Sequence, residues 1–210
     1  MRLAHTRAFE VLRDPSPEDP WRVLFSGCLA GWRCGVDGTT NGVYPNIVAL
    51  LALPTVQVIA FCPEQHTMGT PRTTPDLHGG DGFDVLDGEA RVRDERGVDL
   101  TEAMIEGARA MVAHALAERA ELAILMDMSG ACGSQVISDG CRFDAERRYQ
   151  RGVGVATAAL LRAGVPVVSQ RDHFTLGALR ARLEPGYEPP NGALDHHETD
   201  WVRGYFADRS

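Results

Sequence analysis

Continuous apolar runs, rather than alternating ones, mark the strand candidates of this chain. Four runs contain mainly apolar side chains, and they span residues 22–27, 56–61, 122–126 and 165–169. A strand that is apolar on both faces is typical of a parallel sheet that helices cover on both sides. We therefore expect these four runs to lie in one mostly parallel sheet.

Between and after the later apolar runs, apolar side chains recur at the spacing of a helix. Apolar side chains recur three and four positions apart over residues 101–119, and Asp99 with Glu102 resembles a capping box at the start of this helix. Similar patterns predict helices over residues 153–162 and 174–183. Strands and helices that alternate along the chain predict an α/β fold, a single domain with a mostly parallel sheet flanked by helices.

The parts of the chain outside this alternation differ in composition. Residues 63–97 are dense in Pro, Gly, Asp and Thr and follow neither period, so we expect a long loop there, which is either functional or disordered. In this interpretation residues 1–20 are an N-terminal extension and residues 21–171 are the α/β domain. Residues 172–210 are a C-terminal extension that ends in aromatic side chains, and we expect it to dock on the core or on a partner.

Composition and charge exclude several classes of protein. The 210 residues are 44% hydrophobic and 24% charged, and no apolar run approaches the roughly 18 to 20 residues of a membrane span. The 21 basic residues, all arginine, are outnumbered by 29 acidic ones, and the net charge of −8 disfavours nucleic acid as a partner. Without lysine, Schiff-base and P-loop lysine chemistry are excluded. The N-terminus lacks the apolar core of a secretory signal, so we expect a cytoplasmic protein, and the sequence carries no indication of its oligomeric state.

Three of the five cysteines directly follow predicted strands or lie just beyond them. Cys28 follows the first run, Cys62 the second, and Cys132 lies shortly after the third. Ligands of open α/β sheets bind in the crevice outside the carboxyl ends of the strands, so the three thiols should converge there. Two interpretations stay open at this point: a metal or cluster site, or small buried hydrophobic side chains.

The other two cysteines are weighed separately. Cys34 is six residues from Cys28, close enough to replace it as a ligand or to form a disulfide with it on oxidation, and we favour a position beside the ligands or in a substrate pocket. Cys141 lies in the run SDGCRF, and we expect it to have no role in the site.

Several segments together resemble successive blocks of the DUF523 family. They are the runs FSGCLAGWRCGVDG, FCPE, GTPR followed by HGGDGFDVLDGEARV, SGACGS, and GVGVATAALLRAGVPVVS. The resemblance covers about residues 22–171, and the family includes iron–sulfur-dependent thiouracil desulfidases. It implies that residues 21–171 are a DUF523-like desulfidase domain and that Cys28, Cys62 and Cys132 hold a [4Fe-4S] cluster. The partner it implies is a small thiolated substrate.

Three thiolates around a four-iron cluster leave one iron without a protein ligand. Iron is thiophilic, so the open iron could bind a substrate sulfur while water adds to the neighbouring carbon, in a step that is hydrolytic and not redox. Glu64, two residues after Cys62, is our candidate for the catalytic acid or base. Ser129, three residues before Cys132, could hydrogen-bond the substrate or relay a proton.

Each candidate also has a structural interpretation. Glu64 could serve as a helix cap or pair with Arg72, and the Ser129 hydroxyl could bond its local backbone. We assign Cys34, Asp37, Arg72 and Gly133 to the substrate pocket, and we also expect Asp37 to shape a turn with Gly38. The scattered group of His66, Asp76, His78 and Asp81 is more typical of solvated loop residues than of a zinc site.

The sequence thus predicts a [4Fe-4S]-dependent, non-redox desulfidase acting on a thiolated, thiouracil-like nucleobase or a small thioamide. Two alternatives remain. One is a carrier or sensor that binds a cluster or metal without catalysis. The other is a zinc hydrolase that uses the same thiols, since tetrahedral sulfur sites accept either metal.

Overall fold

The computed structural model describes residues 12–40 and 42–207. Its centre is a four-stranded sheet in the order β2-β1-β5-β8, and every neighbouring pair in it is parallel. The four strands are β1 (Trp21–Ser26), β2 (Val56–Phe61), β5 (Leu122–Leu125) and β8 (Val167–Ser169). Each coincides with one of the predicted apolar runs to within two residues at either end. The prediction of an α/β fold with a parallel sheet is confirmed.

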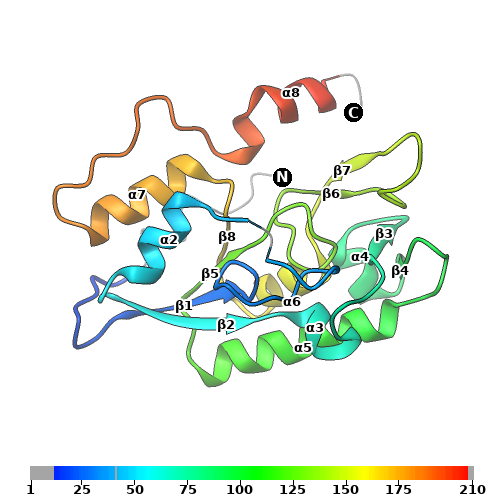
Figure 1. The fold of residues 1–210 in the computed structure, drawn as a ribbon, viewed down its shortest axis with the longest axis horizontal. Coiled ribbons are helices and arrows are strands. Elements are labelled where there is room, and N and C mark those ends of the chain that lie inside the picture. The colour runs from blue at the N-terminus through cyan, green and yellow to red at the C-terminus, as the bar shows by residue number, and fades with distance from the viewer. Residues whose placement is uncertain (1–11, 41, 208–210) are drawn as a thin grey trace.

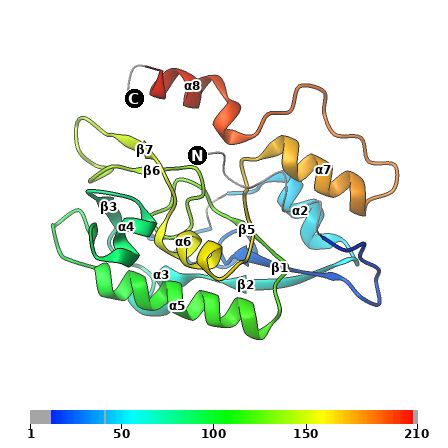
Figure 2. The same ribbon diagram turned by 180° about the vertical axis from the view of Figure 1, so that it is seen from behind.

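Helices cover both faces of this sheet (Figures 1 and 2). One face carries α2 (Pro45–Ala52) and α7 (His173–Leu183), and the other carries α5 (Thr101–Ala117) and α6 (Val155–Arg162). The apolar stripe predicted for α5 is buried, including Met104, Ala108 and Met111. The predicted capping box at its start is wrong, because Leu100 occupies the N-cap and the Asp99 carboxylate instead accepts the Thr101 amide.

The expectation of a long loop over residues 63–97 is also wrong. This segment contains four short elements: α3 (Pro63–Met68), β3 (Asp76–His78), α4 (Gly82–Asp87) and β4 (Arg91–Arg93). Strands β3 and β4 pair antiparallel at the edge of the molecule (Figure 1). None of the four exceeds six residues, so none is long enough to show a hydrophobic period. Local caps define the helices instead, with the Cys62 sulfur at the start of α3 and a capping box between Asp81 and Asp84 in α4.

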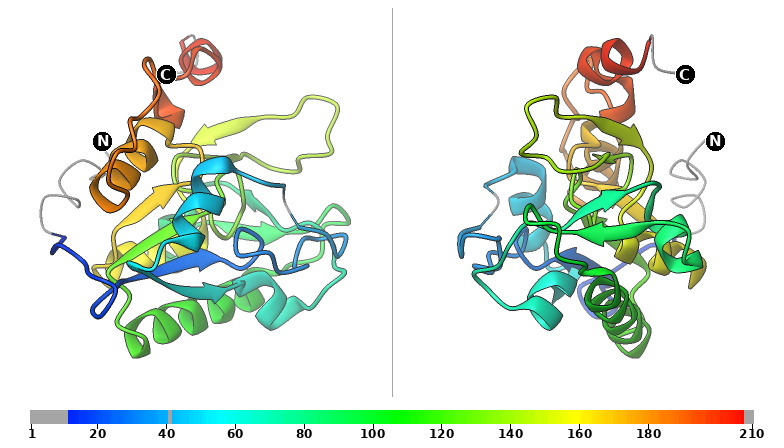
Figure 3. Two further views of the ribbon diagram at one scale, coloured as in Figure 1. Left: turned by 60° about the vertical axis from the view of Figure 1, so that its left-hand side comes forward. Right: turned by 90° about the vertical axis from the view of Figure 1, so that its right-hand side faces the viewer.

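Five further elements of the described residues, α2 among them, had no counterpart in the sequence analysis. Strands β6 (Val136–Ser138) and β7 (Tyr149–Arg151) form an antiparallel hairpin, and the chain ends in η1 (His196–Glu198) and α8 (Asp200–Phe206). Figure 3 shows α8 beyond the hairpin, on the opposite side of the molecule from α5. The Tyr205 hydroxyl accepts the amide of Tyr149, so α8 docks on the β6–β7 hairpin.

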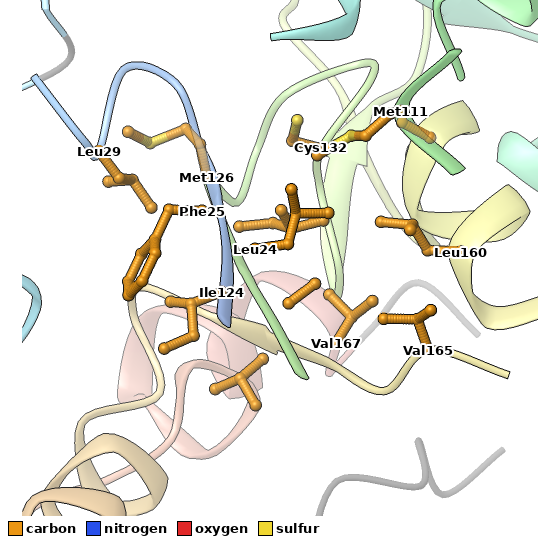
Figure 4. Packing of buried hydrophobic residues seen from close by; sticks show 14 of the residues in the cluster. Leu24, Phe25, Leu29, Met111, Ile124, Met126, Cys132, Leu160, Val165 and Val167 are labelled. Atoms are coloured by element: carbon orange, nitrogen blue, oxygen red, sulfur yellow. The ribbon is translucent and has the colours of Figure 1, made fainter. Parts of the chain in front are cut away.

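The core lies between the sheet and its helices, where Leu24, Phe25 and Ile124 are almost completely buried. In Figure 4, Cys132 and Met126 lie at one end of the packed side chains, while Val165 and Val167 lie at the other. Cys132 and Met126 both belong to this buried core cluster. No helix in the described part of the chain is long and apolar enough to cross a membrane.

Candidate functional site

A cavity of about 290 Å³ lies at the carboxyl ends of three neighbouring strands. Ser26 ends β1, Phe61 ends β2 and Met126 follows β5, and all three line the cavity. The chain leaves β1 toward β2 on one side of the sheet and later returns to add β5 and β8 on the other. Parallel α/β sheets bind ligands at this kind of switch in strand order. The volume is near the lower end of the roughly 300 to 1,000 Å³ typical of small-molecule sites.

Four cysteines line this cavity: Cys28, Cys34, Cys62 and Cys132. Cys28, Cys34 and Cys132 are buried and Cys62 is partly buried, and none forms a disulfide. Cys28 and Cys62 lie just after β1 and β2, Cys132 lies on the loop after β5, and Cys34 lies farther along the loop after β1. The three thiols that follow strands therefore meet, as the strand-end rule predicts, and Cys34 lies with them.

The thiols interact closely enough to change one another's acidity. A hydrogen bond from the Cys34 thiol, followed in importance by the Gln65 amide, holds the pKa of Cys62 below its usual value despite burial. Hydrogen bonds to Cys28 and Cys62, together with burial, raise the pKa of Cys34. Burial also raises the pKa of Cys132, which feels the charges of Cys62 and Cys28. The arrangement favours a thiolate at Cys62, the form that binds metals.

Glu64 lies in the first turn of α3 and lines the same cavity. Its Oε2 accepts hydrogen bonds from Arg72 Nε at 3.2 Å and Nη2 at 2.5 Å, and its Oε1 accepts the Ser129 hydroxyl at 3.1 Å. Both members of the Glu64–Arg72 pair are largely buried, with side-chain exposures of 12% and 6%. The carboxylate is thus fixed in orientation by partners on both oxygens. Glu64 pairs with Arg72, as its structural interpretation predicts, and it also lines the cavity, as a catalytic role requires.

Ser129 uses its whole hydrogen-bonding capacity within the protein. Its hydroxyl donates to Glu64 and accepts the backbone amides of Ala131 at 3.2 Å and Cys132 at 3.1 Å. A hydroxyl has one donor and two acceptor positions, so none remains for a substrate. Ser129 therefore orients Glu64 and shapes the turn that carries Cys132.

The loop before Ser129 contains two features that the sequence analysis missed. Asp127 is buried and lines the cavity, where its Oδ1 accepts the amides of Met128, Ser134 and Gln135. Met128 has a φ of 60°, in the left-handed region that side chains rarely adopt. Such residues persist where surrounding contacts enforce them, commonly at functional sites.

Further polar residues line the cavity without having been predicted. Arg171 follows β8 and Asp127 follows β5, so the rule that found the cysteines would have found both. Tyr44, Thr74 and Arg142 carried no such signal, because they come from a helix start, a short loop and the β6–β7 turn.

Two residues assigned to the pocket do not line it. The Asp37 carboxylate accepts the amide and hydroxyl of Thr39 and so closes the predicted turn. Gly133 is packed so closely that a Cβ there would lie 2.5 Å from Ile137 Cγ2. Both shape the backbone next to the cavity. Cys141 does not line the cavity, in agreement with the sequence analysis.

His66, Asp76 and Asp81, three of the four residues in the scattered group, have other contacts. Asp76 binds Ser138 and Arg142, Asp81 caps α4, and the His66 ring contacts Phe61. Across residues 12–40 and 42–207, no three His, Cys, Asp or Glu side chains are arranged to hold a single metal ion.

Comparisons with known proteins give consistent matches. The model of the 2-thiouracil desulfurase family matches residues 23–172. A protein of Bacillus subtilis (strain 168), the Uncharacterized protein YbbK, is 34% identical over 151 residues, which are 71% of this chain and 96% of that protein. A solved structure, that of the [4Fe-4S]-dependent thiouracil desulfidase TudS, is similar with a TM-score of 0.62 and 29% identity. That match covers 77% of this chain and 98% of TudS.

Proposed function

Because the chain belongs to the 2-thiouracil desulfurase family, we propose that it is a [4Fe-4S]-dependent desulfidase that hydrolyses the C–S bond of a thiolated nucleobase or small thioamide. The observation that carries the proposal is the convergence of Cys28, Cys62, Cys132 and Glu64 on one cavity. In the same proposal residues 21–171 are the catalytic domain. A reducing, cytoplasmic setting suits cysteines that form no disulfide.

The donor set fits a cluster. Cys28, Cys62 and Cys132 supply three thiols from three strand ends, and thiolates are the usual ligands of iron–sulfur clusters. A bound cluster with three protein ligands would supply an open, thiophilic iron that polarises a substrate sulfur.

Glu64 is the proposed catalytic base. Arg72 occupies Oε2, and Ser129 occupies one position on Oε1, so Oε1 keeps a lone pair for a water molecule. In its ionised form this carboxylate can take a proton from water as the water adds to the thiocarbonyl carbon. The proton then has to reach the leaving side, and Glu64 is the group we propose to deliver it.

Size and charge support a small substrate. A cavity of about 290 Å³ suits a single ring better than a polymer, and the net charge of −8 repels a phosphate backbone. Arg142 and Arg171 line the cavity and offer hydrogen-bond donors to the oxygen atoms of a nucleobase.

The test is metal analysis followed by turnover. Protein purified without oxygen should contain iron and acid-labile sulfide in equal amounts and should release sulfide from 2-thiouracil. Zinc without labile sulfide would favour a zinc hydrolase. A stable cluster with no sulfide release from thiouracil, thionucleosides or small thioamides would favour a carrier or sensor.

A further inference from the structure

One carboxylate fastens both ends of the loop that carries Ser129 and Cys132. Asp127 Oδ1 accepts the amide of Met128 at 3.0 Å, at the start of the loop, and those of Ser134 at 2.8 Å and Gln135 at 3.2 Å, at its end. The conformation of the loop therefore depends on where this one side chain is held. Asp127 itself is completely buried.

The other oxygen of Asp127 is held by the C-terminal tail. His196 Nδ1 lies 2.5 Å from Asp127 Oδ2, and the exposures of the two side chains are 4% and 0%. Three backbone amides donate hydrogen bonds to Asp127, which favours the ionised form of its carboxylate. An ionised carboxylate only accepts hydrogen bonds, so His196 Nδ1 is the donor in this contact. Ser169 Oγ, at 3.3 Å, is the other side-chain contact of Oδ2 among the residues described.

The tail is fixed at this position by its own backbone and side chains. The amide of His196 donates to Asp172 Oδ1 at 3.1 Å, and the amide of His197 donates to Gln135 Oε1 at 2.9 Å. One residue earlier, the Asp195 carboxylate accepts both the amide and the hydroxyl of Thr175. The Trp201 ring of α8 stacks on the His196 ring. These contacts on both sides of His196 fix the position of its imidazole next to Asp127.

His196 lies beyond the residues that the family model matches, which end at residue 172. We propose that His196 is a positioning residue supplied by the C-terminal tail: through Asp127 it holds the loop of residues 128–135 so that Ser129 meets Glu64 and Cys132 faces the cavity. The functional part of this inference rests on the proposed desulfidase activity. Without the imidazole, Asp127 Oδ2 stays buried but loses the hydrogen bond that His196 donates to its charged oxygen. The carboxylate then no longer has one fixed position.

Amide hydrogen exchange of the full-length protein tests the positioning role directly. In His196→Ala, the amides of Met128, Ser134 and Gln135 should exchange about tenfold faster or more, the effect of losing a hydrogen bond to a charged group. The amide of Phe25 in β1 should keep its rate. His196→Asn, whose side-chain amide can donate from nearly the same place as Nδ1, should restore much of the protection.

The neighbouring histidine provides the control. The His197 side chain is exposed and only its backbone amide contacts Gln135, so His197→Ala should leave all of these rates unchanged. Unchanged exchange in His196→Ala, or an equal effect of His197→Ala, would overturn the proposal. Faster exchange spread equally over Phe25 would assign His196 to global stability and would overturn it too.

The turnover of the same variants separates this inference from the proposed function. Compared with the wild-type protein at equal cluster content, His196→Ala should have a kcat with 2-thiouracil that is about tenfold lower, with a smaller change in KM. A loosened loop with unchanged kcat would overturn the positioning role. If the wild-type protein itself releases no sulfide, the proposed function fails, and the exchange measurements alone decide the structural link from His196 to the loop.

Discussion

The Ser129 hydroxyl donates a hydrogen bond to Glu64 Oε1 at 3.1 Å, although 65 positions separate the two residues in the chain. Glu64 follows the end of β2, and Ser129 lies on the loop that follows β5. The bond therefore crosses above β1, the strand between them, and ties together the segments that carry Cys62 and Cys132. In the proposed mechanism this link fixes the base relative to two cluster ligands.

Ser129→Ala removes this link and two acceptor contacts at once. The amides of Ala131 and Cys132 lose their side-chain acceptor, so the free energy of unfolding should fall by about 1 to 3 kcal/mol. Sulfide release from 2-thiouracil should slow because Glu64 is no longer oriented. Urea denaturation and sulfide assays measure the two effects.

Ser134→Ala is the matched control on the same loop. The buried Ser134 Oγ has no hydrogen-bond partner in the described part of the chain, so its removal should leave the free energy of unfolding unchanged or slightly higher. Equal losses of stability in the two variants would show that the Ser129 contacts contribute nothing specific.

Cys28→Ser should abolish retention of the cluster, whereas Cys141→Ser should leave it almost intact. The first thiol lines the cavity and the second does not. Iron and acid-labile sulfide, measured after anaerobic reconstitution, test the difference. A cluster retained in Cys28→Ser but lost in Cys34→Ser would instead make Cys34 the ligand.

Asp127 should make the stability of the protein depend on acid pH. Burial raises the pKa of its carboxyl, but the His196 side chain and the backbone amides outweigh burial and hold the pKa below its usual value. The folded chain therefore binds fewer protons here than the unfolded chain. The resulting stability is present above about pH 4, the pKa of an unfolded aspartate, and is lost as the pH falls through the lower pKa of the folded state.

Asp127→Asn should flatten this part of the pH dependence. Urea denaturation between about pH 5 and pH 2 should show a smaller loss of unfolding free energy in the variant than in the wild-type protein. Asp144→Asn, at an exposed position, is the control and should keep the wild-type slope. An Asp127→Asn slope equal to that of the wild type would contradict the assignment.

The sheet could be predicted because its strands are mainly apolar runs, and β1, β5 and β8 are almost entirely buried. The apolar run at residues 56–61 has the same bounds as β2, and the helix predicted over residues 101–119 differs from α5 only at its end. Between residues 63 and 97 the prediction failed, because elements of three to six residues are defined by caps and by pairing with distant segments, which no local period reveals. The β6–β7 hairpin was not predicted for the same reason.

The site could be predicted where it depends on strand ends. Cys28, Cys62, Glu64 and Cys132 line one cavity because parallel strands bring their carboxyl ends to the same edge. His196 could not be found in this way. It reaches Asp127 through a tail whose path follows from contacts with Thr175, Asp172 and Gln135, and adjacent histidines in a polar stretch carry no local sign of such a partner.

The central claim is that this chain is a catalyst and not a carrier. A catalyst needs Glu64 to exchange a proton, whereas a carrier does not. Glu64→Gln keeps the size and most of the hydrogen bonding of the side chain but removes its ability to take up a proton. Positioned acid–base groups contribute about 10² to 10⁴-fold in rate. Glu106→Gln, on the exposed face of α5, is the matched control and should behave as the wild type.

The most direct measurement is the rate of sulfide release from 2-thiouracil by the reconstituted Glu64→Gln protein, compared with the wild type at equal cluster content. We expect the variant to keep its cluster and bind the substrate, and to release sulfide more slowly by a factor of about 10² to 10⁴. Release at the wild-type rate would remove Glu64 from the mechanism, and loss of the cluster would reassign the residue to a structural pairing with Arg72.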